Sequence, residues 1–117
     1  MKKFSERDID YLNSILDHCD RIEQLKERFG DSFDVFANDP AYIDAALMNI
    51  FQIGELSNQL SDECREAFNE TPWHQIYGTR NIIAHAYVKV DNTIIWNIIA
   101  YDIPRLKKEI NKKTGIL

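Results

Sequence analysis

One short stretch of the sequence, RNIIAHAY at positions 80–87, gathers four polar side chains suited to chemistry on a phosphate. They are Arg80, Asn81, His85 and Tyr87, separated only by isoleucine and alanine. Histidine titrates near neutral pH, so it can take a proton from an RNA 2′-hydroxyl or give one to a leaving oxygen. Arginine can bind a phosphate and stabilise the negative charge of the transition state. The set therefore fits cleavage of an RNA phosphodiester without a metal.

Helical geometry predicts that these side chains share one face. At about 100° per residue with Arg80 at zero, Asn81 falls at about 100°, His85 at about 140° and Tyr87 at about 340°. Ala84 lies between them and leaves a hollow. The stretch contains no acidic residue, so Arg80 has no predicted local partner. A merely solvated face is the alternative, although such faces usually carry lysine and glutamate.

The elements that must position this stretch are predicted to be helices, because no segment alternates apolar and polar residues for long. Long helices are expected from a Ser5 cap to Gly30, over 40–60, over 71–87, and from an Asp91 cap to the C-terminal lysines. Shorter helices are expected at 33–37 and 61–70. Pro104 cannot donate a hydrogen bond to Ala100, so the last helix should kink there. The predicted fold class is all-α, an antiparallel bundle of four or five helices in one domain, 1–117.

Composition and charge narrow the kinds of partner. With 117 residues, 44% hydrophobic and 28% charged, the chain has the profile of one globular domain. Residues 1–70 hold seven Lys/Arg and sixteen Asp/Glu, whereas residues 71–117 hold seven and three, for a total of −5. This distribution argues against an extended phosphate-tracking surface and favours a local anion site near RNIIAHAY, in the basic part.

Other features of the sequence indicate a cytoplasmic protein without a metal or other cofactor. The N-terminal lysines precede no apolar stretch, and no apolar run is long enough to span a membrane. Cys19 and Cys64 lie far apart and are expected to be reduced, half-buried thiols. No His/Cys/Asp group has metal-ligand spacing. Trp96 and Ile103, seven residues apart, are expected to be exposed and to form an interface.

The stretch R-N-x-x-x-H resembles the R-x(4–6)-H signature of the HEPN superfamily, and with Tyr87 it resembles the R-x4-H-x-Y form of HepT-like toxins. Three further blocks resemble the same family, so the resemblance covers nearly the whole chain. These blocks are IGEL at 53–56, PWHQIYGTRNIIAHAY at 72–87 and VDNTIIWNIIAYDIPRLKKEI at 90–110.

The resemblance implies a HEPN-like helical homodimer whose two motifs meet in a cleft and act as a metal-independent ribonuclease. It also implies a toxin paired with an MntA-type nucleotidyltransferase antitoxin, which transfers AMP from ATP to the motif tyrosine. Carried over to this sequence, Arg80 and His85 would be catalytic and Asn81 would support them. Tyr87 would accept the AMP, which beside Arg80 would block the cleft and neutralise its charge.

Glu55 and Tyr77 are secondary candidates. Glu55 matches the family's Gly-Glu pair and is expected either to support the site or to be an ordinary helix acid. Tyr77 and Trp73 could stack on an RNA base, although core or interface packing is the competing interpretation. A different functional class also remains: a non-catalytic helical module that binds a nucleotidyltransferase. The intact motif favours the enzyme, whereas the acidic first 70 residues are compatible with a partner-binding face.

Overall fold

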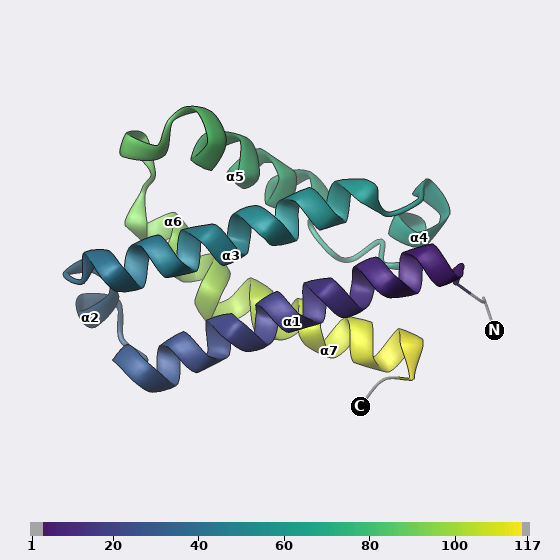
Figure 1. Cartoon of the computed structure of the whole chain (residues 1–117), viewed down its shortest axis with the longest axis horizontal. Helices are drawn as coiled ribbons and strands as arrows, with labels where there is room; N and C mark the ends of the chain where they lie inside the picture. The colour runs from purple at the N-terminus through teal and green to yellow at the C-terminus, as the bar shows by residue number, and fades with distance from the viewer. Residues whose placement is uncertain (1–3, 116–117) are drawn as a thin grey trace.

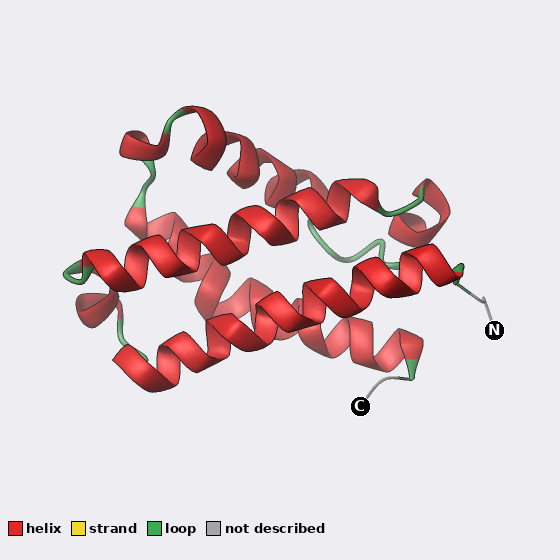
Figure 2. Ribbon diagram, in the orientation of Figure 1, coloured by secondary structure: helices red, strands yellow, loops and turns green. Residues whose placement is uncertain are grey.

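The structure, a computed structural model, describes residues 4–115 and consists of helices and short connections (Figures 1 and 2). No strand occurs within these residues, which confirms the predicted all-α class. Lys2 and Lys3, which belong to the N-terminal stretch considered above, lie outside the described residues. The elements in chain order are α1 (Glu6–Phe29), α2 (Phe33–Ala37), α3 (Pro40–Gln59), α4 (Asp62–Ala67), α5 (Trp73–His85), the 3-10 turn η1 (Tyr87–Lys89), α6 (Asn92–Asn97), the π turn η2 (Ile98–Asp102) and α7 (Ile103–Thr114).

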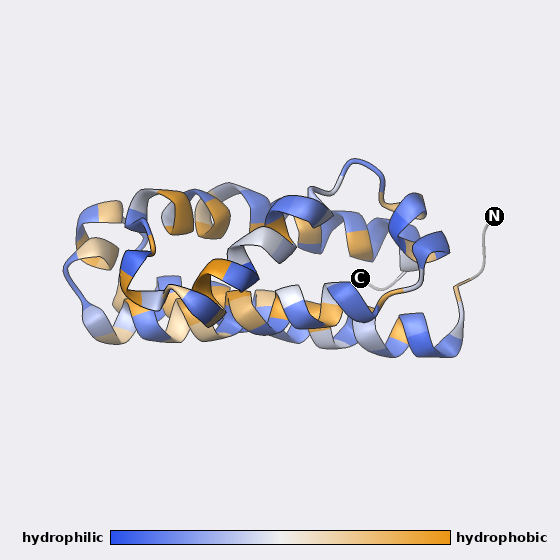
Figure 3. Cartoon of the chain, turned by 90° about the horizontal axis from the view of Figure 1, so that it is seen from above, coloured by the Kyte–Doolittle hydropathy of each residue, from blue (hydrophilic) through white to orange (hydrophobic). Residues whose placement is uncertain are grey.

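The long helices form an antiparallel bundle in which α3 is central. α3 packs against α1 on one side and against α5 on the other, and α7 packs against α1 (Figure 1). Seen from above in Figure 3, the helices form elongated layers in which hydrophobic residues recur beside hydrophilic ones along each helix. This arrangement is the amphipathic packing predicted from the sequence.

Local signals fix the ends of the helices where the sequence predicted them. The Ser5 hydroxyl accepts a hydrogen bond from the Asp8 N–H at 3.1 Å and caps α1, which ends at Gly30 with φ of 122°. Asp39 caps α3, whose first residue is Pro40, and Asp91 caps α6. These predicted boundaries are confirmed, and they set the length and phase of the helices around the site.

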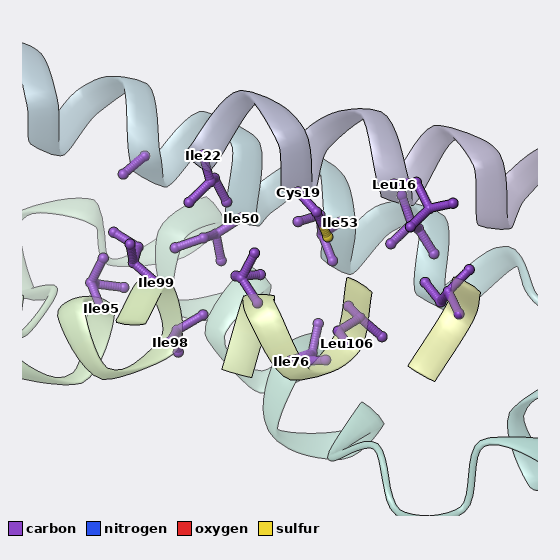
Figure 4. Close-up of a cluster of buried hydrophobic side chains, with 14 of the residues drawn as sticks. Leu16, Cys19, Ile22, Ile50, Ile53, Ile76, Ile95, Ile98, Ile99 and Leu106 are labelled. Atoms are coloured by element: carbon purple, nitrogen blue, oxygen red, sulfur yellow. The ribbon is translucent and has the colours of Figure 1, made fainter. Parts of the chain in front are cut away.

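The core lies where α1, α3 and the α6–α7 run meet (Figure 4). Cys19 points into it among isoleucines and is 0% exposed, and Cys64 is 1% exposed. Neither of these cysteines forms a disulfide, as predicted, but both side chains are fully buried and not half-buried. Burial raises the pKa of Cys19 to about 12, so this thiol belongs to the packing and not to chemistry at the surface.

The interface predicted from Trp96 and Ile103 is wrong. Ile103 is only 2% exposed and lies in the core. Trp96 packs against Phe36 and Tyr42, with ring centroids 5.4 and 6.4 Å away. Trp96 faces inward because α2 covers α6 on that side, a contact that spacing along one helix does not reveal.

The predicted interruption of the last helix takes the form of the π turn η2. The N–H of Ile103 donates to the carbonyl of Ile98, five residues earlier, where an α-helix would use the fourth. Pro104 follows directly and has no N–H to give to Ala100. The departure from α geometry is therefore accommodated just before the proline.

Within residues 4–115, no helix is long and apolar enough to cross a membrane.

Candidate active site

The site lies on α5, along its border with α3. Ile76 and Thr79 are the buried residues of α5, whereas Arg80 and Asn81 are half-buried and His85 is exposed. The predicted face thus runs from Arg80, which packs against α3, to His85, which faces solvent. The side chains that could do chemistry are accessible, and the helix that carries them is anchored from behind.

Gly54 brings α5 unusually close to α3 at the level of Arg80. A Cβ added at Gly54 would lie 2.5 Å from the Cβ of Arg80 and 2.9 Å from its Cγ, closer than real Cβ contacts allow. The missing side chain therefore lets the stem of Arg80 pass directly over the α3 backbone. It also brings the guanidinium to the next residue of α3, Glu55.

Arg80 is held by groups from both helices. Its Nε forms an ion pair with Glu55 Oε1, although the N–H is not aligned with that oxygen as a hydrogen bond requires. Its NH1 donates to Asn81 Oδ1 at 2.8 Å. The guanidinium also lies over the rings of Phe51 and Tyr77, 5.1 and 5.7 Å from their centroids. Arg80 has no acidic partner on its own helix, as expected, but it is not unpaired, because Glu55 reaches it from α3.

Arg80 keeps donors for a ligand despite these contacts. A guanidinium has five N–H groups, and the described contacts engage only the Nε side and one NH1 proton. Its side chain is 20% exposed. An anion can therefore bind to the remaining donors of a guanidinium whose direction is already set by Glu55, Phe51 and Tyr77.

His85 is the last residue of α5 and is exposed. No side-chain hydrogen bond of His85 is present within residues 4–115, and the Asn81 oxygen is taken by Arg80. Asn81 and His85 share a face, as predicted, but they do not hydrogen-bond each other. The imidazole is thus free to meet a substrate or a residue of another protein chain.

Tyr87 lies off the helix that was predicted to carry it. α5 ends at His85, and Ala86 has φ of −145° and ψ of 43°, outside the helical region. Tyr87 instead belongs to η1, and its hydroxyl donates a hydrogen bond to Asp44 Oδ1 on α3. This hydrogen bond raises the pKa of Tyr87. The predicted alignment of Tyr87 with Arg80 is therefore wrong.

The two polar contacts of α5 and η1 with α3 are well separated. Asp44 holds Tyr87 and Glu55 holds Arg80, and these acids are eleven residues apart, about 16 Å along the helix axis. Sequence reasoning missed Asp44. The available signal was its spacing from Glu55, since positions 44, 48, 51 and 55 fall on one face of a helix.

The two aromatic candidates, Tyr77 and Trp73, lie in different surroundings. Tyr77 flanks the Arg80 guanidinium and thus belongs to the site. Trp73 packs edge-on against Phe68, and its indole N–H donates to the Phe68 carbonyl at 3.1 Å, so the packing interpretation is correct for Trp73. No group of three or more His, Cys, Asp or Glu side chains that could hold a metal ion is found in residues 4–115.

The helical bundle thus carries a half-buried arginine and an exposed histidine five residues apart on one helix, the features to compare with known families. The family model described as Ribonuclease HepT-like matches residues 15–112 of the sequence. The chain belongs to the HepT-like ribonuclease family.

Individual relatives agree with this family. A protein of Caldanaerobacter subterraneus subsp. tengcongensis named "Putative RNase" is 37% identical over 103 residues, which cover 87% of this chain and 89% of the relative. Another "Putative RNase", from Methanocaldococcus jannaschii, is 30% identical over 91% of this chain and 96% of its own length. The "Probable ribonuclease HepT" of Thermococcus cleftensis is 29% identical over 88% of this chain and 92% of its own length. No solved structure gives a significant match.

Proposed function

We propose that this HepT-like ribonuclease is the toxin of a HepT/MntA-type toxin–antitoxin system and cleaves RNA without a metal, at a site shared by two copies of the chain. The observation that carries the proposal is the Arg80 guanidinium, braced by Glu55 and two aromatic rings with donors to spare. His85 lies on the same helix, about 7.5 Å further along its axis. This is a phosphate-binding group beside a proton-transfer group.

The proposed chemistry is attack of the RNA 2′-oxygen on the adjacent phosphorus. The His85 imidazole takes the 2′-hydroxyl proton as the new P–O bond forms, and the P–O bond to the 5′-oxygen breaks. Arg80 stabilises the charge on the phosphate oxygens in the transition state. Asn81 holds one side of the guanidinium through its amide oxygen.

The 5′-oxygen needs a proton as it leaves, and one histidine cannot serve both ends of the reaction at once. A homodimer solves this problem, because a two-fold axis near α5 brings a second Arg80–His85 pair to the same phosphate. The exposure of His85 at the end of α5 supports this arrangement, since the imidazole is not used within its own chain.

Glu55 and Tyr77 are proposed as positioning residues. Glu55 fixes the Nε side of the Arg80 guanidinium. The rings of Tyr77 and Phe51, over which the guanidinium lies, restrict its movement. An arginine that is already oriented loses less freedom when it binds a phosphate. Loss of either residue should weaken cleavage without removing the chemistry itself.

Tyr87 is proposed as the acceptor of AMP from the MntA-type antitoxin. It is 47% exposed, and its hydroxyl lies at the surface. AMP would add bulk and negative charge to the segment directly after His85, where it would obstruct RNA and repel its phosphates. Because Tyr87 contacts α3 at Asp44, and not beside Arg80, this obstruction acts first at the His85 end of the site.

The experiment that tests the ribonuclease is expression of the chain alone, with growth and RNA integrity as readouts. Wild type should arrest growth and degrade RNA, and the purified protein should cleave RNA in excess EDTA. His85→Ala and Arg80→Ala should abolish both effects. His74→Ala is the matched control, because His74 is also exposed on α5 but stands apart from these contacts.

Each outcome of this experiment is decisive. Intact RNA with the wild-type protein, or undiminished cleavage by His85→Ala, would contradict the ribonuclease proposal. Intact RNA together with tight binding of a nucleotidyltransferase would favour the non-catalytic module instead. Loss of cleavage in EDTA would contradict the metal-independent step alone.

A further inference from the structure

The contact between Tyr87 and Asp44 joins two exposed residues from distant parts of the sequence. Asp44 lies in the first half of α3, and Tyr87 opens η1 after the end of α5. The tyrosine hydroxyl donates its proton to the carboxylate Oδ1. Among residues 4–115, Asp44 is the only side chain that hydrogen-bonds this hydroxyl.

Folding gives little reason for this contact. Both side chains are exposed, and a hydrogen bond between exposed groups replaces bonds to water at little net gain. The core is built by other faces of α3, and Asp44 caps no helix, since Asp39 performs that role. The contact does, however, fix the direction of one phenolic proton at the surface of the molecule.

We propose that Asp44 is the base for nucleotidyl transfer to Tyr87, an inference that rests on the proposed role of Tyr87 as the AMP acceptor. A nucleoside triphosphate, held by the transferase, supplies the nucleotidyl group. The Tyr87 oxygen forms a bond to the α-phosphorus, and the bond between that phosphorus and the bridging oxygen to the β-phosphorus breaks. Pyrophosphate leaves with the electron pair of the broken bond, and the phenolic proton passes to the Asp44 carboxylate.

The geometry suits this role in two ways. The proton already points at the acceptor that would receive it, so no rearrangement has to precede the transfer. The phenolic oxygen keeps its lone pairs for the phosphorus, and the 47% exposure of Tyr87 leaves an approach for a second protein. The acceptor chain would thereby bring its own base to the transferase.

The test uses the purified full-length chain, a purified MntA-type nucleotidyltransferase and ATP labelled at the α-phosphate. The initial rate of label incorporation is measured for wild type, Asp44→Asn, Asp44→Glu and Asp44→Ala. Asn still accepts a hydrogen bond but cannot take the proton, so Asp44→Asn should be slowed about 10²-fold. Asp44→Glu should recover part of the rate. Asp17→Asn is the matched control, because Asp17 is an exposed helix carboxylate without a described contact.

The pH dependence separates a base from a residue that only orients the tyrosine. With Asp44 as base, the wild-type rate should vary little from about pH 6 to about pH 9. The residual rate of Asp44→Asn should rise steeply over the same range, because the transfer then depends on the free phenolate. Thermal unfolding of each variant shows whether the fold is intact.

The results distinguish this inference from the proposed function. If wild type incorporates label at Tyr87, located by mass spectrometry and lost in Tyr87→Phe, while Asp44→Asn reacts at the wild-type rate, the base is overturned and the acceptor stands. A rate lost only in Asp44→Ala also overturns the base, because an oriented hydroxyl would then suffice. If wild type takes up no label, or takes it up elsewhere, the proposed acceptor itself fails.

Discussion

Two polar contacts, one between α1 and the start of α4 and one between α3 and α5, are built on opposite principles. In the first, Asp8 of α1 is 5% exposed, and both of its carboxylate oxygens are occupied by Ser61, from the N–H at 2.9 Å and from the hydroxyl at 2.7 Å. In the second, Arg80 is braced by Glu55 and Asn81, yet keeps N–H groups that the described contacts do not engage. In the contact between Asp8 and Ser61, both carboxylate oxygens are hydrogen-bonded within the protein, and we call this contact saturated. The contact around Arg80 in the candidate site is not saturated.

The protonation of Asp8 reflects this saturation. Burial by itself would raise the pKa of its carboxyl, but the hydrogen bonds from Ser61 and Ser5 outweigh burial and lower it. Ser61 also accepts from the Cys64 N–H at 3.0 Å, so the same hydroxyl caps α4. A carboxylate whose oxygens already accept hydrogen bonds within the protein has no free acceptor for a ligand. Unused donors therefore distinguish the site from the scaffold, and substitutions in both contacts can test this comparison.

Among the substitutions that test this comparison, Arg80→Lys should have the largest effect. Lysine keeps the positive charge but lacks the planar guanidinium, so it cannot contact Glu55, Asn81 and a phosphate at the same time. Cleavage of RNA should therefore fall about 10²-fold. The thermal unfolding midpoint should change little, because the site is at the surface. The measurement is single-turnover cleavage with circular dichroism as control. A lysine variant that cleaves at the wild-type rate would contradict the role given to the unused donors.

Gly54→Ala tests the close approach of α3 and α5. The added methyl group would have to displace the Cβ of Arg80, 2.5 Å away, so the free energy of unfolding should fall by about 1–3 kcal/mol and cleavage should weaken. Gly78→Ala is the matched control on α5, since a Cβ there meets nothing within 4 Å. It should raise stability by about 0.5–1 kcal/mol. Urea unfolding measures both, and equal effects would contradict the close approach.

Asp8→Asn tests the saturated contact. Removing the charge should lower the free energy of unfolding by about 1.5 kcal/mol at pH 7, because two hydrogen bonds to a carboxylate are weakened. The pKa of Asp8 is lowered in the folded protein from its ordinary 3.8, so the carboxylate stabilises the fold above that pH. Its contribution is lost as the pH falls through the lower, folded-state value. The difference between wild type and Asp8→Asn in urea unfolding should therefore disappear at low pH, and a constant difference would argue against this origin.

Lys107→Met should have the smallest effect. The Lys107 ammonium lies 2.8 Å from Asp20 and 3.0 Å from Glu23, joining α7 to α1, and these hydrogen bonds raise its pKa. Both acids are partly exposed to solvent, so loss of the Lys107 ammonium should cost less than about 1 kcal/mol. The cost should shrink further in about 1 M salt. Lys108→Met, at an exposed position without a described contact, is the control, and a loss that does not respond to salt would contradict an ion-pair origin.

Much of the fold follows from local sequence signals. Ser5 and Asp91 each cap the helix that they were predicted to cap, because capping depends on residues within one turn. Trp96 and Ile103 were misassigned because burial depends on which helix packs alongside. The periodicity of one helix gives the direction of a side chain but not what covers it.

The candidate site shows the same limit. The face of Arg80, Asn81 and His85 follows from helical geometry, since all three lie on one uninterrupted helix. Glu55 and Asp44 reach α5 and η1 from α3, so their roles depend on how two helices cross. Tyr87 was misplaced because the end of α5 at Ala86 has no glycine or proline to mark it.

The end of α5 at His85 also governs how the motif tolerates changes in chain length. A residue inserted between Arg80 and His85 would rotate the imidazole by about 100° around the helix axis, away from the Asn81 side and to the other flank of Arg80. The same insertion after Ala86 would fall in backbone that is already non-helical and could be absorbed there. The number of residues between arginine and histidine therefore sets the angle between their side chains, whereas the distance from histidine to tyrosine can change in length without turning α5.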